Sequence, residues 1–80
     1  MTDIKQLLYR SIHRGCKETD FLIGGFAKEN LKQMNDKELQ IFDDFLQEDD
    51  MEIYDWILAK ITVPQKYFSV VQKIQTFHKI

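Results

Sequence analysis

Residues 35–46 read NDKELQIFDDFL and contain the most regular amphipathic pattern in the chain. Its apolar side chains recur at the spacing of one helix face: Leu39, Phe42, Phe45 and Leu46. Asn35 and Glu38 match a capping box, in which each side chain bonds the backbone N–H of the other residue at the start of a helix. The stretch therefore predicts an amphipathic helix whose apolar stripe lies in a core.

Towards the N-terminus, two more helices are predicted. Asp3 and Gln6 suit a capping box for a first helix, which continues until Gly15 supplies a left-handed C-cap. A second helix is expected over about residues 17–32 from its apolar spacing. The residues expected on its inner stripe are Phe21, Leu22, Gly25, Phe26 and Leu31. The pair Gly24-Gly25 weakens this helix by roughly 1 kcal/mol per glycine relative to alanine, which suggests that another backbone approaches there.

Towards the C-terminus, Asp49 or Asp50 can cap a fourth helix of about ten residues. The residues expected on its inner face are Ile53, Trp56, Ile57 and Ile61. Thr62 and Gln65 suit a capping box for the last helix, and Pro64 falls in its first turn, where the missing N–H is harmless. The residues expected to line this helix are Tyr67, Phe68, Val71, Ile74, Phe77 and His78.

Signals for β-structure are weak, because no Asn-Gly or Asp-Gly turn lies between alternating apolar runs. The chain of 80 residues is also too short to divide its apolar side chains between two stable cores. We therefore predict an all-α fold, a small five-helix bundle, with residues 1–80 as a single helical domain.

The single cysteine, Cys16, cannot form an internal disulfide, so the fold must rest on packing and suits a reducing compartment. The longest apolar runs, such as residues 21–23, fall far below the roughly 20 residues that span a bilayer. Thr2, Asp3 and Lys5 interrupt the start, which does not resemble a signal peptide. We expect a cytoplasmic monomer without membrane insertion.

Charge is unevenly distributed along the chain. Residues 36–55 hold nine acidic residues and one basic residue, so this segment carries −8, and the rest of a chain of net charge −2 carries +6. A net negative charge argues against a nucleic-acid partner, because proteins that bind nucleic acids normally present a basic face.

The sequence contains no catalytic signature. His13 and His78 lie near opposite ends of the chain without carboxylates or cysteines at metal-ligand spacing, so we predict no metal site. Cys16 has no partner histidine and is better explained as a small filler at a helix junction than as a nucleophile. Adjacent acids such as Asp43-Asp44 usually face water on a surface helix. We predict that the protein is not an enzyme.

The segment Arg14-Gly15-Cys16-Lys17-Glu18 forms an R-G-x-x-E pattern at a predicted helix break, and two interpretations are open. In the first, Arg14 complements the C-terminal dipole of one helix, Gly15 supplies the positive φ of its cap and Glu18 favours the start of the next helix. In the second, these residues contact a partner molecule.

Several motifs together resemble the succinate dehydrogenase flavinylation (FAD assembly) factor family. The matching elements, over about residues 7–58, are Arg14-Gly15-x-x-Glu18, Asp20, an apolar-aromatic helix, Asn35-Asp36-x-Glu38-Leu39, and Asp49-Asp50-x-Glu52-Ile53-Tyr54-Asp55-Trp56-Ile57. The chain lacks the proline that members often carry before the aromatic element, since it reads Asp49-Asp50-Met51-Glu52 there. The last helix matches only in being helical.

The resemblance implies a protein that binds the flavoprotein subunit of succinate dehydrogenase, with the related fumarate reductase as a further candidate client. It implies that this chain promotes the covalent attachment of FAD to a histidine of that subunit and holds no FAD stably itself. The residues implied in partner binding are Arg14, Gly15, Glu18, Asp20, Asp49, Asp50 and Tyr54. Arg14 would donate charge-assisted hydrogen bonds to the partner, Gly15 would let two backbones approach, and Glu18 would orient Arg14 or pair with a basic residue opposite.

Tyr54 and Trp56 are two residues apart on a helix and so point to different sides. Trp56 shares the stripe of Ile53 and Ile57 and is expected in the core, which leaves Tyr54 pointing outward as a candidate contact residue.

An antitoxin-like or helix-turn-helix regulator is the alternative function, because small helical bundles often serve in this way. A recognition helix should be basic, whereas the helix over residues 35–46 carries four acids and one lysine. Salt-sensitive binding to DNA would favour this alternative.

Overall fold

The computed structural model describes residues 3–80, in which all regular structure is helical. The five α-helices are α1 (Ile4–Ile12), α2 (Lys17–Asn30), α3 (Asp36–Leu46), α4 (Asp50–Ile57) and α5 (Phe68–His78). Two short 3₁₀ turns, η1 (Leu31–Gln33) and η2 (Gln65–Tyr67), follow α2 and precede α5. The prediction of an all-α, five-helix fold is confirmed.

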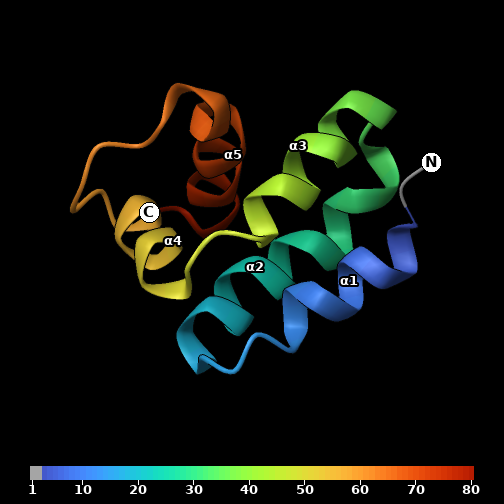
Figure 1. Cartoon of the computed structure of the whole chain (residues 1–80), viewed down its shortest axis with the longest axis horizontal. Coiled ribbons are helices and arrows are strands. Elements are labelled where there is room, and N and C mark those ends of the chain that lie inside the picture. The colour runs from blue at the N-terminus through green and yellow to red at the C-terminus, as the bar shows by residue number, and fades with distance from the viewer. Residues whose placement is uncertain (1–2) are drawn as a thin grey trace.

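The helices pack around one another in short, crossing pairs rather than as a parallel bundle (Figure 1). Helices α1 and α2 lie side by side along the lower part of the view, and α3 lies above them. Helices α4 and α5 contact each other on the left and both contact α2. The described chain measures 32 × 25 × 22 Å along its principal axes.

The centre of the core is formed by α3, as its apolar spacing predicts. Leu39, Phe42, Phe45 and Leu46 are all buried. The ring of Phe45 lies 6.1 Å from that of Trp56 on α4 and 5.4 Å from that of Tyr67 on η2, measured between ring centroids. Aromatic side chains from three elements therefore meet around Phe45.

Helix starts follow the predicted caps in two of four cases. The Asn35–Glu38 capping box is present, with both reciprocal bonds formed at 2.8 and 3.0 Å. Asp49, rather than Asp50, caps α4 by accepting a hydrogen bond from the Met51 N–H at 3.1 Å. At α1, Asp3 accepts from the Lys5 N–H in place of a reciprocal box with Gln6.

The predicted Thr62–Gln65 capping box is wrong. No side-chain cap bond begins the last helical segment, because the chain enters it through the 3₁₀ turn η2, and Pro64 is the residue that precedes this turn. Helix α5 then begins at Phe68 without a side-chain cap.

Three apolar residues expected in the core are exposed: Phe21 by 70%, Ile61 by 46% and Phe68 by 59%. On α2, Ile23 and Ala27 are buried, so the inner face is rotated by one residue from the predicted stripe. Ile61 lies beyond the end of α4 and therefore cannot continue its inner face.

The predicted close approach at Gly24-Gly25 is confirmed for Gly24. A Cβ atom on Gly24 would lie 3.2 Å from Ile12 Cγ1 and 3.7 Å from the carbonyl oxygen of Ser11, so the missing side chain lets α1 pack tightly on α2. A Cβ on Gly25 would meet only the side chains of Phe77 and His78, at ordinary contact distance.

Gly15 does have a positive φ, +90°, but it is not the C-cap of α1. The helix ends at Ile12 with His13 as the cap, so Gly15 lies within the loop that joins α1 to α2. Over the described residues, no helix is long and apolar enough to cross a membrane.

Candidate functional site

The side chain of Arg14, in the loop between α1 and α2, is buried against the turn between α3 and α4. Its Nε donates to Asp50 Oδ1 at 2.6 Å, Nη1 donates to the carbonyl oxygen of Leu46 at 2.6 Å, and Nη2 donates to that of Glu48 at 2.9 Å. Only 9% of the side chain is exposed. Each guanidinium nitrogen is therefore engaged within the chain.

The backbone of the same loop is held from the other side by Asp20 on α2. Asp20 Oδ1 accepts a hydrogen bond from the Arg14 backbone N–H at 2.9 Å. Gly15 follows with its positive φ, and a Cβ atom there would meet no atom within 4 Å. The loop is thus anchored at Arg14 and open to approach at Gly15.

Glu18 lies on the exposed face of the first turn of α2. Its carboxylate accepts a hydrogen bond from the Cys16 thiol at 3.3 Å. A backbone hydrogen bond within its own residue, and then the Cys16 thiol, lower the pKa of the Glu18 carboxyl from its usual value. Asp50, rather than Glu18, is the carboxylate that orients Arg14, because the Nε bond goes to Asp50.

Helix α4 places Met51 and Tyr54 beside this loop. Together with Cys16 and Glu18 they line a hollow of about 230 Å³. The Met51 side chain is 62% exposed, and Tyr54 is half-buried, with Lys60 Nζ lying 5.7 Å from the centre of its ring. Trp56 is buried in the core, so the predicted division between an inward Trp56 and an outward Tyr54 agrees with the fold.

A second hollow, of about 410 Å³, lies at the other side of the loop. It is lined by Tyr9, Arg10, His13, Arg14, Glu48, Asp49 and Asp50. The rings of Tyr9 and His13 lie 4.2 Å apart at its edge. Because Arg14 and Asp50 both line this hollow, while Cys16 and Met51 line the other, the anchored loop separates the two.

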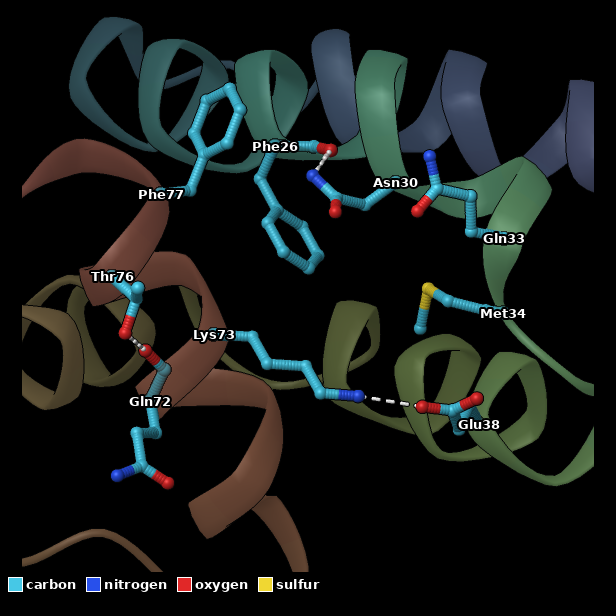
Figure 2. Close-up of a pocket in the computed structure, with 9 residues that line it drawn as sticks. All are labelled: Phe26, Asn30, Gln33, Met34, Glu38, Gln72, Lys73, Thr76 and Phe77. Carbon is cyan, nitrogen blue, oxygen red and sulfur yellow. Dashed lines mark hydrogen bonds and ion pairs between the residues drawn. The ribbon is translucent and has the colours of Figure 1, made fainter.

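A hollow of about 500 Å³ between α2, α3 and α5 lies away from these residues (Figure 2). Figure 2 shows the Lys73 side chain reaching across it from α5 to Glu38 on α3, at 2.6 Å. The Asn35 backbone N–H, and then Lys73, lower the pKa of the Glu38 carboxyl. The Lys73–Glu38 ion pair spans this hollow, and no predicted site residue lines it. The hollow is therefore a poorer candidate for the functional site.

Among residues 3–80, no group of three or more His, Cys, Asp or Glu side chains is arranged to hold a metal ion.

The seven residues predicted to bind a partner lie on α2, on α4 and in the loops that precede these two helices, and two of them, Asp20 and Asp50, bond Arg14 directly. Asp20 and Asp50 point inward to Arg14, whereas Asp49 caps α4 and Tyr54 faces the smaller hollow. Met51 was not predicted from the sequence, because no motif marks it. The carbonyl oxygens of Leu46 and Glu48, which accept from Arg14, were not predicted either, because a main-chain acceptor has no sequence signal.

Comparison with known proteins relates this arrangement to one family. The family model described as the flavinator of succinate dehydrogenase matches residues 5–78. The chain is 38% identical over 74 residues to the mitochondrial succinate dehydrogenase assembly factor 2 of Dictyostelium discoideum, a match that covers 92% of this chain and 52% of that protein. It is 37% identical over 62 residues to the FAD assembly factor SdhE of Acetobacter pasteurianus, covering 78% and 57%.

A yeast relative extends the comparison. Over 51 residues the chain is 49% identical to the mitochondrial succinate dehydrogenase assembly factor 2 of Saccharomyces cerevisiae, which covers 64% of this chain and 32% of that protein. The chain therefore spans about half the length of the Dictyostelium relative and about a third of the yeast relative.

Proposed function

The chain belongs to the family of succinate dehydrogenase flavinators, and on this premise we propose that it binds the flavoprotein subunit of succinate dehydrogenase and promotes the covalent attachment of FAD to that subunit. The family match covers the anchored loop, α4 and the core that positions them. Fumarate reductase, whose flavoprotein is related, is a further candidate client.

One observation carries the proposal: the residues of the R-G-x-x-E pattern and of the acidic-aromatic element form one surface. Arg14 and Asp50 are 36 positions apart in the chain and lie 2.6 Å apart in space. Cys16 and Glu18 from one segment line the same hollow as Met51 and Tyr54 from the other. A surface assembled from the two motifs suits recognition of a single partner.

Within this surface the residues divide by exposure. Gly15, Glu18 and Met51 are exposed and Tyr54 is half-buried, so these residues are the proposed contacts. Arg14, Asp20 and Asp50 hold them in place through bonds within the chain. The absence of a side chain at Gly15 leaves room for a backbone of the partner to approach.

Promotion of flavin attachment requires no catalytic group from this chain. When FAD is bound to the partner, the flavin itself supplies the reactive carbon and a histidine of the partner supplies the nucleophile, so a binding protein contributes orientation and electrostatics. We propose that this chain acts as an assembly factor, holding no FAD stably and lacking an enzymatic reaction of its own. The contact is transient and charged, so it weakens as salt rises.

The experiment co-purifies the chain with the flavoprotein subunit and follows flavin fluorescence on that subunit in a denaturing gel. Glu18→Gln is expected to weaken binding and slow flavin attachment. Glu29→Gln is the matched control, because Glu29 is also an exposed acid on α2 but lies in its last turns, away from the loop. Failure of the unaltered chain to bind the subunit would overturn the proposal, and equal effects of both variants would remove Glu18 from the contact surface.

No observation favours the helix-turn-helix alternative. On α3, Glu38, Asp43 and Asp44 each pair with a basic residue of another element, so this helix presents acids that are tied to the chain rather than a basic reading face.

A further inference from the structure

We infer that Arg14 and Asp50 form a positioning pair that holds the loop between α1 and α2 in its binding conformation before a partner arrives. In this arrangement Arg14 does not itself contact the partner. The inference deepens the proposed function and rests on it, because the partner whose binding the pair prepares is the flavoprotein subunit.

The location of the guanidinium explains its hold on the loop. Leu46 is the last residue of α3, and Asp50 is the first residue of α4. Carbonyl groups at a helix C-terminus lack partners within the helix and carry the negative end of its dipole. Arg14 donates to the carbonyl of Leu46 and to that of Glu48, and pairs with the Asp50 carboxylate. Arg14 therefore caps the C-terminus of α3 from a distant part of the same chain and links this helix end to α4.

A direct contact between Arg14 and a partner would have to break these bonds. The three acceptors would then lose a charged donor in a place where the Arg14 side chain is only 9% exposed. A polar group that is shielded from water and loses its hydrogen-bond partner destabilises the structure, so a contact with the partner would have to compensate for each bond broken. The neighbouring Gly15 and Glu18 need no such release, because both are already exposed.

Arg10, the basic residue in the last turn of α1, supplies an internal comparison. Arg10 donates to Asp43 Oδ1 at 2.6 Å, the same distance as the Arg14–Asp50 bond. Arg10 has a single acceptor, however, and 35% of its side chain is exposed. The Arg10–Asp43 pair joins α1 to α3 without touching the loop, so its removal tests general effects of losing an ion pair.

Asp50→Asn keeps the size of the side chain and removes its charge. If the loop then occupies its binding shape for about a tenth of the time, the apparent dissociation constant rises about tenfold. The change should appear as slower association, with the dissociation rate within about twofold, because the bound complex keeps its contacts. Arg14→Lys removes the planar fork and should act in the same way.

The test measures association and dissociation rates with the flavoprotein subunit for the unaltered chain, Asp50→Asn, Arg14→Lys, the double variant and the control Asp43→Asn. A positioning pair predicts that Asp50→Asn weakens binding about tenfold, that the double variant is no weaker than either single one, and that Asp43→Asn binds like the parent. If Arg14 gripped the partner, Asp50→Asn would free the fork, and binding would be unchanged or tighter; that result would overturn the inference.

A second measurement needs no partner. Amide hydrogen exchange in the free protein should be faster at Arg14, whose N–H donates to Asp20, in Asp50→Asn and unchanged there in Asp43→Asn, with the core amides of α3 protected in both. Unchanged exchange at the loop would overturn the inference even if binding failed for another reason. Failure of the parent to bind, with the loop loosened as expected, would instead count against the proposed function alone.

Discussion

At the scale of single residues, Phe45 shows how strongly the centre of α3 controls stability. Its side chain has no exposed surface and contacts the rings of Phe42, Trp56 and Tyr67. Phe45→Ala should lower the free energy of unfolding by about 3–5 kcal/mol, because it removes a buried ring and leaves a cavity. Urea denaturation followed by circular dichroism measures the change.

Phe21→Ala is the matched control, since Phe21 is an aromatic residue that is 70% exposed. A change within about 0.5 kcal/mol is expected for this surface position. Similar losses for the two variants would contradict the assignment of Phe45 to the core.

Tyr67 gives the protein a stability limit at alkaline pH. Burial, and then the hydrogen bond that the hydroxyl donates to Glu48 at 2.6 Å, together raise the pKa of Tyr67 to about 12. The folded pKa lies above the unfolded value near 10, so the contribution of the neutral hydroxyl is complete below about pH 10 and is lost as the pH rises through about 12.

Tyr67→Phe should therefore be less stable than the parent at neutral pH, by about 1–2 kcal/mol, since one hydrogen bond to a charged group is lost. The difference should shrink between about pH 9 and about pH 11, one unit on either side of the unfolded tyrosine pKa, and unfolding midpoints at the two pH values would detect this change. A difference that stays constant over this range would show that the hydroxyl is not held neutral by the fold.

Residue burial could be predicted where the helical spacing was unambiguous, as for Phe42, Phe45 and Trp56. It failed for Phe21, because the run Phe21-Leu22-Ile23 offers two inner faces one residue apart, and only packing against the other helices selects between them. The prediction failed for Phe68 because Tyr67 belongs to the 3₁₀ turn η2 and Phe68 begins α5, so the two residues do not share one 3.6-residue spacing.

At the scale of elements, the end of α4 carries avoidable backbone strain. The Lys60 N–H bonds the Asp55 carbonyl at 2.8 Å and the Ala59 N–H bonds that of Trp56 at 3.1 Å, which is the pairing of a Schellman motif. Ala59 occupies the position that glycine favours and has a φ of +60°. Left-handed backbone costs an L-residue about 1–2 kcal/mol, and glycine avoids this cost.

Ala59→Gly should therefore stabilise the protein by up to about 1 kcal/mol, after the larger entropy of the unfolded glycine is taken into account. Thermal or urea unfolding measures the effect. Ala27→Gly provides the control, because Ala27 is buried within α2 and glycine there should destabilise by about 1 kcal/mol. A destabilising Ala59→Gly would mean that another contact of the methyl group outweighs the strain.

Element boundaries were predictable where a side-chain cap exists, as at Asn35 and Asp49. The Arg14–Asp50 contact could not be predicted from the sequence, although both residues were candidates for partner binding. Their meeting depends on how the turn after α3 presents the carbonyl groups of Leu46 and Glu48, and this geometry is set by the packing of α3 on α1.

At the scale of the whole molecule, folding brings the acidic segment of the sequence into ion pairs with basic residues outside it. All four ion pairs found in the described chain join an acid of residues 36–55 to a base outside that segment. The pairs are Arg10–Asp43, Arg14–Asp50, Lys66–Asp44 and Lys73–Glu38. The acidic segment therefore lies between the basic N-terminal and C-terminal parts and is paired with both.

This arrangement predicts loss of stability in acid. Lys66 lowers the pKa of the Asp44 carboxyl, and the Asn35 backbone and Lys73 lower that of Glu38. For a carboxyl with a lowered folded pKa, the stabilisation is present above the unfolded value and is lost as the pH falls through the folded value. Unfolding midpoints should thus decrease as the pH falls below the ordinary pKa values of glutamate and aspartate, about 4.3 and 3.9.

Lys66→Gln tests this explanation, since it removes the principal cause of the shift at Asp44. The variant should lose less stability than the parent between neutral and acidic pH. An identical acid dependence in both proteins would place the titrating groups elsewhere.

The same four pairs bear on how quickly the chain finds its fold. Three of them join residues 33, 36 and 35 positions apart, so each closes a long stretch of chain. In the collapsing, still unfolded polypeptide, a negative middle flanked by positive ends attracts both ends over roughly 10 Å at 0.1 M salt and over about 3 Å at 1 M. Refolding in stopped-flow experiments should accordingly slow as ionic strength rises, because salt screens the attraction that brings the oppositely charged segments of the unfolded chain together.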